Sequence, residues 1–189
     1  MNTLFQAETV FPEGFSYFPD FIKKEEERSL LDIIAKTELH SFFFQGYEAK
    51  RKVASFGYDW SFGKRTLSKG KEIPDGFDSL IQKVADHFSI SANAFAELLI
   101  TEYPPGSAIN WHRDAPPFDI IAGISLLSDC IFRLRPHGKT KYKRSEIISF
   151  PVNRRSLYFI QGAARKDWQH SIAAVKQLRY SITLRTLKQ

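Results

Sequence analysis

The order of sequence periodicities constrains this fold most: two helical segments come first, and from about residue 97 onward the pattern is one of short strands. A helix is expected from Lys23 to about Thr37, and a second over about residues 76–89, where apolar side chains recur at helical spacing. Strands are expected at residues 97–103, 119–127, 130–135, 145–150, 155–161, near 170–173 and at 177–186. This order predicts an α+β, mainly β domain, an antiparallel barrel or jelly roll with helices on one side.

The region before residue 95 holds two further strand candidates, at residues 41–45 and 53–60. Between them, Gly46–Lys52 is basic and is interpreted as a mobile loop, and residues 61–75 are interpreted as a second loop. The basic and aromatic residues here could contact phosphates and stack a base. The alternative is a solvated sheet edge with its aromatic rings tucked onto the core.

Composition excludes several classes of protein. The chain has 189 residues, 43% hydrophobic and 25% charged, which is typical of one globular domain. The single Cys130 excludes an internal disulfide and a cysteine-based zinc site. No apolar run approaches the ~20 residues of a membrane helix, and the N-terminus lacks signal-peptide features, so we expect a cytosolic protein with no membrane partner.

The charge of the chain is positive, with a net value of +6 and a sequence pI of about 9.4. Such a surplus favours a polyanionic partner, although a basic protein without a nucleic-acid partner fits the charge equally well. Many of the basic residues lie in one predicted hairpin, from Arg133 to Arg144. That hairpin is a solvated loop by default and a phosphate contact by hypothesis.

The stretch from Tyr103 to Asp114 carries candidate metal chemistry. A strand ends at Tyr103-Pro-Pro-Gly106, and the chain then presents His112 and Asp114 two residues apart. In an extended segment, residues at that spacing point to the same face. With a distant second histidine they form the facial triad that holds iron(II) and leaves three positions open. An isolated His-x-Asp pair on a surface is the alternative.

The last expected strand supplies the context for this pair. Its alternation places Arg179, Ser181, Thr183 and Arg185 on one face, opposite an apolar face. In an ordinary half-buried strand that polar face would meet water. In a barrel covered by helices it would point inward, where two arginines need anionic partners such as the ends of a dicarboxylate. His170 lies one strand earlier and is the candidate second histidine.

Three motifs carry a family resemblance: Trp-His-Arg-Asp at 111–114, Trp-x-His-Ser-Ile at 168–172 and Leu-Arg-Tyr-Ser-x-Thr at 178–183. With them, residues 40–187 resemble the AlkB family of iron(II)- and 2-oxoglutarate-dependent dioxygenases, in particular compact bacterial AlkB-like proteins. The resemblance implies a double-stranded β-helix, or jelly roll, with N-terminal supporting helices. It implies one domain over residues 1–189, with helices and a substrate-lid region over about 1–95 and a catalytic core over about 96–187.

The resemblance also implies residue roles. Iron(II) would be held by the catalytic residues His112, Asp114 and His170. For 2-oxoglutarate, Arg179 would pair with the distal carboxylate, Arg185 would sit near the 1-carboxylate and orient Asp114, and Tyr103 and Ser181 would contact the cosubstrate. Two departures are present: many relatives have Asn where this chain has Thr101, and several base-repairing relatives have an acidic residue where this chain has Ala115-Pro116-Pro117.

The implied activity uses O2 and 2-oxoglutarate to remove N-linked methyl groups from bases of alkylated DNA or RNA, releasing formaldehyde. The base must be single-stranded or flipped out of a duplex to reach the iron. The candidate substrate residues are Tyr47, Arg51, Tyr58, Trp60 and Trp111, with the 46–52 loop as a lid and the protein expected to be a monomer.

Other functions are compatible with the same residues. The same iron chemistry could act on a protein side chain or a small molecule, because a fold does not fix a substrate. A metal-binding jelly-roll sensor without turnover is a second alternative, and failure to consume 2-oxoglutarate would favour it. A zinc hydrolase is a third, but two inward arginines have no evident role in activating zinc-bound water.

Overall fold

The structure is a computed structural model that describes residues 9–44 and 47–188, without the side chains of Phe44 and Tyr47. The helices are α1 (Lys24–Ile34), α2 (Asp78–Phe88) and α3 (Gly162–Lys166), with 3-10 turns at Asp75–Phe77, Ala92–Ala94 and Arg144–Glu146. The strands are β1 (Phe15–Phe18), β2 (His40–Phe44), β3 (Tyr47–Ser61), β4 (Thr66–Lys69), β5 (Phe95–Tyr103), β6 (Ile109–His112), β7 (Phe118–Leu126), β8 (Cys130–Pro136), β9 (Ile148–Val152), β10 (Leu157–Ile160), β11 (Trp168–Ile172) and β12 (Arg179–Leu187). Among the described residues, no helix is long and apolar enough to cross a membrane.

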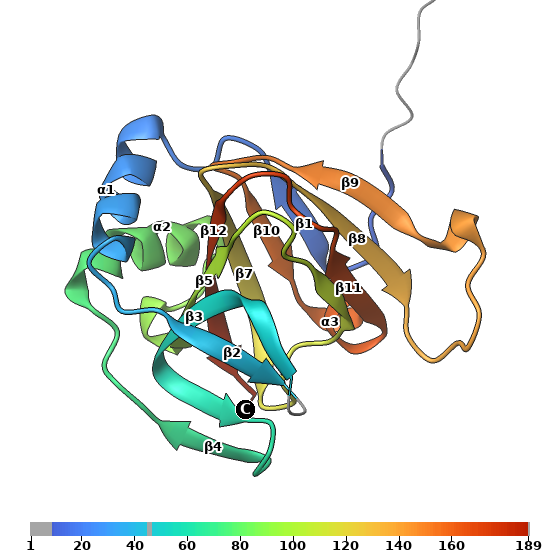
Figure 1. The fold of residues 1–189 in the computed structure, drawn as a ribbon, viewed down its shortest axis with the longest axis horizontal. Helices are drawn as coiled ribbons and strands as arrows, with labels where there is room; N and C mark the ends of the chain where they lie inside the picture. The colour runs from blue at the N-terminus through green and yellow to red at the C-terminus, as the bar shows by residue number, and fades with distance from the viewer. Residues whose placement is uncertain (1–8, 45–46, 189) are drawn as a thin grey trace, which may run out of the picture.

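Two antiparallel sheets form the body of the protein (Figure 1). The major sheet has the order β1-β10-β7-β12-β5-β3-β2, with β4 paired to β3, and the minor sheet has the order β6-β11-β8-β9. Helices α1 and α2 lie together against the major sheet in Figure 1. The predicted mainly β jelly roll with N-terminal supporting helices is therefore confirmed.

The apolar residues are divided between two layers. Between the helices and the major sheet, Leu30 and Val84 pack in one cluster with Ile182. Between the two sheets, Phe118 of β7 and Phe132 of β8 belong to a second cluster. Strand β12 separates the two layers, because its apolar side chains face the helices and its polar side chains face the minor sheet, as its alternation predicted.

Three differences from the predicted elements appear in the described residues. Residues 47–52, expected as part of a mobile loop, belong to β3, a long strand that pairs with β2 and with β5; Gly46 lies outside the described residues. This segment pairs with β2, and the ladder with β5 begins at Lys52; the backbone pairing overrides the low strand propensity of the charged segment. The short elements β4 and α3 were not predicted, and the expected strand over 145–150 begins only at Ile148. A short element gives too few residues for a clear periodicity.

Gly57 marks the point where β3 leaves the major sheet. Its pair with Glu97 is the last in the β3–β5 ladder, and pairing with β4 begins at Tyr58. The backbone there has φ of +81°, and a Cβ atom would lie 2.1 Å from the carbonyl oxygen of Ala96. Only glycine satisfies both conditions without strain. The change of direction carries Trp60 toward the space between the sheets.

We expect Gly57→Ala to destabilise the protein by about 2–4 kcal/mol, because the left-handed conformation costs ~1–2 kcal/mol and the clash ~1–3 kcal/mol. Urea unfolding of Gly57→Ala and wild type would measure this. Gly63→Ala is the matched control, since a Cβ atom at Gly63 meets no atom within 4 Å. Equal midpoints for the two variants would contradict the role given to Gly57.

Candidate metal centre and active site

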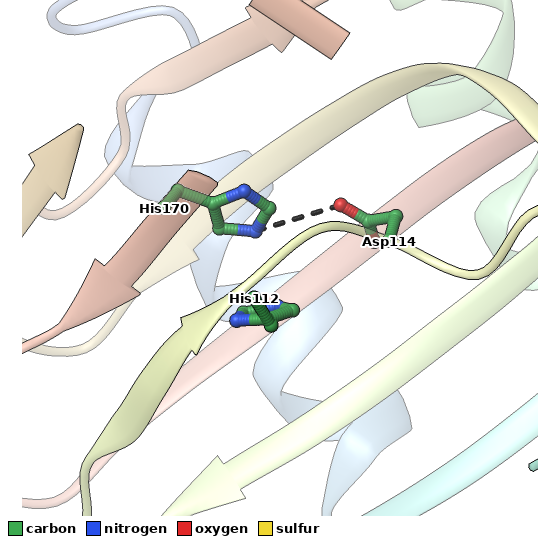
Figure 2. Close-up of side chains that lie close together, drawn as sticks. All are labelled: His112, Asp114 and His170. Atoms are coloured by element: carbon green, nitrogen blue, oxygen red, sulfur yellow. Dashed lines mark ion pairs between the residues drawn. The ribbon is translucent and has the colours of Figure 1, made fainter. Parts of the chain in front are cut away.

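Three potential metal ligands converge at the end of the minor sheet. His112 ends β6, Asp114 follows it, and His170 lies directly opposite His112 on the neighbouring strand β11. One ligand atom from each residue lies within 4.8 Å of the others. Figure 2 shows the three side chains facing a common point. The cross-strand register thus brings together residues 58 positions apart in the chain, and two histidines with one carboxylate suit iron(II) with open coordination sites.

The imidazoles of this cluster are held neutral. The carbonyl oxygen of Asn110 accepts a hydrogen bond from Nδ1 of His112 at 2.8 Å, which leaves Nε2 with its lone pair. Burial lowers the pKa of His112, and burial together with the neighbouring His112 lowers the pKa of His170 to about 3. Nε2 of His170 lies 3.5 Å from Oδ2 of Asp114, the contact drawn as a dashed line in Figure 2. Metal binding requires the neutral imidazole, so both rings are prepared for it.

A buried chain of charges orients Asp114. Its Oδ1 accepts two hydrogen bonds from Arg185, from Nε at 3.0 Å and from Nη2 at 2.7 Å. Burial would raise the pKa of Asp114, but Arg185 and the two histidines hold that pKa well below its ordinary value. Oδ2 of Asp114 is buried and has no hydrogen-bond partner among the described residues. One oxygen is therefore fixed by the protein, and the other is left for a metal ion.

Glu97, which was not predicted, completes this chain. Its Oε2 accepts a hydrogen bond from Nη1 of Arg185 at 2.6 Å, and Ser55 donates one to its Oε1 at 3.2 Å. Burial raises the pKa of Glu97, while Arg185 acts in the opposite direction. Burial alone would lower the pKa of Arg185, but Glu97 and Asp114 raise it above its ordinary value. The guanidinium is thus held between two carboxylates.

Arg165 was also missed by the sequence analysis. It extends from α3, is 7% exposed, and its Nη2 donates to the carbonyl oxygens of Asp114, Ala115 and Phe118 at 3.2, 2.8 and 2.9 Å. These contacts fix the loop that carries the metal-binding carboxylate. No sequence signal could reveal them, because every partner is a backbone carbonyl.

Arg179 is fully buried, with 0% of its surface exposed. Its Nε donates to Oγ of Ser125 at 3.0 Å, and its guanidinium lies 4.8 Å from the centre of the Tyr103 ring. Neither Nη1 nor Nη2 has a hydrogen-bond partner among the described residues. Since burying an unpaired charge is costly, this guanidinium indicates a binding site for an anionic ligand. Next to it, the hydroxyl groups of Tyr103 and Ser181 lie 3.4 Å apart.

A cavity of about 1220 Å³ opens onto the metal ligands. Of the five candidate substrate residues, three line it: Arg51, Trp60 and Trp111. Tyr58 is not among the described residues that line the cavity, and the side chain of Tyr47 lies outside the described residues. Tyr158, which was not predicted, also lines the cavity, and its ring occupies the space where Gly123 has no side chain.

The family of this chain follows from comparison with known proteins. The profile of the 2OG-Fe(II) oxygenase superfamily matches residues 14–185. The chain belongs to this superfamily. The residues fit the cofactors of the superfamily, because the free oxygen of Asp114 and the two neutral imidazoles suit iron(II), and the unpaired guanidinium of Arg179 suits a dicarboxylate. The predicted cofactors iron(II), 2-oxoglutarate and O2 are thereby confirmed.

Curated relatives include several ALKBH proteins. The tRNA (carboxymethyluridine(34)-5-O)-methyltransferase ALKBH8 of Mus musculus is 30% identical over 173 residues, 87% of this chain and 25% of that protein. The alkylated DNA repair protein ALKBH8 homolog of Arabidopsis thaliana is 26% identical over 90% of this chain and 53% of its own length. RNA demethylase ALKBH5 of Mus musculus is 30% identical over 69% of this chain and 38% of its own length. The predicted AlkB-like membership is confirmed, and the chain spans a quarter to about half of the length of these relatives.

The fold is shared with a solved structure, that of OsALKBH1. The TM-score is 0.71 at 12% identity, and the match covers 94% of this chain and 98% of the other. At this identity the likeness concerns the fold alone, and it supports the double-stranded β-helix described above.

Replacing Glu97 with Ala should lower the free energy of unfolding by about 3–5 kcal/mol, because it removes one partner of a buried ion pair. Chemical denaturation of the variant and wild type would measure the loss. The control is Glu38→Ala, which removes an exposed carboxylate 3.9 Å from His40 and should cost less than ~1 kcal/mol. If the two variants lost the same stability, the bond from Arg185 to Glu97 would not be a main support of the site.

Proposed function

We propose that this protein is an iron(II)- and 2-oxoglutarate-dependent dioxygenase that removes N-linked methyl groups from nucleobases in DNA or RNA. The observation that carries the proposal is the buried guanidinium of Arg179, whose two terminal nitrogens have no hydrogen-bond partner in the part of the chain that the structure describes, in the same interior as three convergent candidate metal ligands. A zinc hydrolase would have no use for such a group. An oxygenase that binds a dicarboxylate does.

The proposed roles follow the geometry of each side chain. His112, Asp114 and His170 would hold iron(II) as the catalytic ligands. Arg179 would bind the distal carboxylate of 2-oxoglutarate through its two unpaired nitrogens, a geometry that suits the planar guanidinium.

Three further residues would complete the cosubstrate site. Tyr103 and Ser181 would hydrogen-bond 2-oxoglutarate beside Arg179. Arg185 would keep Asp114 oriented and add positive charge near the 1-carboxylate. Because Arg185 already donates to Asp114 and Glu97, its main task would be orientation.

The overall reaction balances without any further reductant. One 2-oxoglutarate, one O2 and one N-methyl group give succinate, carbon dioxide and an N-hydroxymethyl group, which then leaves as formaldehyde. Bound iron(II) supplies the activation of O2. The chain itself binds and orients the reactants and keeps the two imidazoles neutral at the metal.

A nucleic-acid substrate is supported by the cavity and by the names of the relatives. Trp60 and Trp111 provide aromatic faces in the cavity wall, and Arg51 provides a cation there. The relatives are named for tRNA, RNA and DNA, so either nucleic acid fits the proposal. The base would be single-stranded or flipped. The lid and stacking roles given to the 46–52 segment, Tyr47 and Tyr58 remain sequence predictions.

The organisation of the chain remains part of the proposal. We take residues 1–189 as one AlkB-like domain, with helices and a lid region over about 1–95 and a catalytic core over about 96–187. A cytosolic location and a monomeric state also remain predictions of the sequence.

The deciding experiment supplies anaerobic protein with iron(II) and 2-oxoglutarate, then adds O2 with an N-methylated single-stranded oligonucleotide. Succinate and formaldehyde should appear in equal amounts, because one methyl group is removed for each 2-oxoglutarate consumed. Both should be lost in His112→Ala, which removes one metal ligand. Succinate without formaldehyde would place the same chemistry on a protein or small molecule, and neither product would indicate a non-catalytic metal-binding module.

Arg179→Gln should raise the KM for 2-oxoglutarate by about 30-fold or more, because losing a buried charge partner costs roughly 2 kcal/mol or more. Steady-state succinate formation at varied 2-oxoglutarate would measure it. The control Lys176→Gln removes an exposed cation shortly before β12 and should leave this KM unchanged. An unchanged KM in Arg179→Gln would place the cosubstrate elsewhere.

A further inference from the structure

The positive charge of this protein is concentrated in one segment, residues 133–147, which we name the basic hairpin. It holds six basic residues and one acidic residue, Glu146. Its net charge of +5 compares with +6 for the whole chain, so the remaining 174 residues are almost neutral. The six basic residues are Arg133, Arg135, Lys139, Lys141, Lys143 and Arg144. A charge surplus gathered in one place indicates an anionic partner more strongly than the same surplus spread over the surface.

The basic hairpin is exposed and poorly neutralised. It joins β8 to β9 and projects from the end of the minor sheet (Figure 1). Lys139 forms an ion pair with Glu146. Among the described residues, the other cations of the hairpin have no ion pair, and Lys141, Lys143 and Arg144 are exposed. The exposed cations are therefore available to a partner.

An aromatic bridge joins the basic hairpin to the cavity. Trp111 precedes the metal ligand His112 and lines the cavity. The guanidinium groups of Arg133 and Arg135 lie over its ring, 5.1 and 4.3 Å from the centre. Arg135 also lies 4.2 Å from the centre of the Tyr142 ring. A continuous row of aromatic rings and cations thus runs from the edge of the active site to the hairpin.

This row is fixed in place by the minor sheet. Nε of Arg135 donates to Oε1 of Gln169 at 2.9 Å, and Gln169 precedes the metal ligand His170. A guanidinium close to two aromatic rings still carries N–H groups at its edges, which suit phosphate oxygens. Arg135 therefore keeps a fixed position relative to the metal ligands.

We propose that the basic hairpin, together with Trp111, binds the sugar–phosphate backbone of the substrate strand on one side of the target nucleotide. The proposal rests on the proposed function and adds the surface that the strand follows outside the cavity. Regularly spaced phosphates match a row of cations, and half-buried aromatic rings next to them suit nucleotides better than acidic peptides or lipid headgroups. Contacts to phosphates carry no sequence information, so this part of the binding should be independent of sequence.

The test measures binding of an unmethylated, fluorescein-labelled 12-nucleotide single strand without iron(II) or 2-oxoglutarate. The hairpin variant combines Lys141→Gln, Lys143→Gln and Arg144→Gln. Each lost phosphate contact should lower the salt slope of log Kd by ~0.7, so the slope should fall by about 2. The affinity at 0.1 M salt should fall by about 100-fold, since each of the three contacts contributes roughly fivefold there.

The matched control removes three exposed cations from α1 and the turn that follows it, on the opposite side of the molecule: Lys24→Gln, Arg28→Gln and Lys36→Gln. It carries the same change in net charge and should bind the strand nearly as wild type does. Equal losses in both variants would show a general field effect and overturn the proposal. Wild-type affinity in the hairpin variant would overturn it as well.

A second measurement separates the hairpin from the chemistry. Turnover of a methylated mononucleoside, which has no backbone phosphates, should have the same KM in the hairpin variant and wild type, whereas the KM for the methylated 12-nucleotide strand should rise. If the strand binds through the hairpin but no methylated strand is demethylated, the proposed function fails and the binding surface stands. If wild type binds no strand but binds phosphatidylserine vesicles through the hairpin, the partner is a membrane surface and the proposal is wrong.

Discussion

The two arginines of β12 set the charge balance of the interior. Arg179 is fully buried and the side chain of Arg185 is 14% exposed, and a cation enclosed in this way is tolerated only with anionic or hydrogen-bonding partners. Arg185 has two carboxylates from this chain, Glu97 and Asp114. Within residues 9–44 and 47–188, the Arg179 guanidinium contacts the hydroxyl of Ser125 and the face of Tyr103. Arg185 therefore stabilises the site. Arg179 has no carboxylate partner in the described part of the chain, and a dicarboxylate cosubstrate would supply one.

The fold makes this arrangement possible by placing β12 in the middle of the major sheet. Strands β5 and β7 flank it and satisfy its backbone groups on both edges. The helices cover its apolar face, and the polar face, on the other side of the strand, therefore faces the minor sheet. That sheet holds His112 opposite His170, and the loop after β6 brings Asp114 to Arg185. The two arginines therefore lie on the major sheet and the two histidines on the minor sheet. Asp114, in the loop after β6, contacts Arg185 on one side and His170 on the other.

The sequence predicted the parts of this site that depend on strand alternation. The common face of Arg179, Ser181, Thr183 and Arg185 and that of His112 and Asp114 follow from a two-residue period, which a sequence displays directly. The choice of His170 as the second histidine came from the family resemblance. Partners contributed by side chains far away could not be predicted. In the sequence, Glu97 is a single acidic residue in a largely apolar strand. In the structure, the hydrogen bonds of Arg165 go to backbone carbonyl oxygens. Neither Glu97 nor Arg165 belongs to a sequence motif or a periodic pattern that would mark its role.

The substrate side of the cavity was predicted less well, for a related reason. At Gly57 the positive φ changes the direction of β3, so the alternation on one side of it does not continue on the other. Of the two aromatic residues that follow Gly57, Trp60 lines the cavity, and Tyr58 is not among the described residues that line it. The segment expected as a basic loop is a strand because its backbone pairs with β2, and only its last residue, Lys52, also pairs with β5.

The guanidinium of Arg179 and the cations of the basic hairpin lie in opposite surroundings. Arg179 is enclosed, so its preference is set by shape and by a low dielectric environment, and salt in the medium has little influence on it. The cations of the basic hairpin are surrounded by water, where each contact is weak and screened by salt. Enclosure suits a small cosubstrate that must be bound in one orientation. An open row suits a long strand that must be held near the site and then released. The division of charge between interior and hairpin thus matches the two reactants of the proposed reaction.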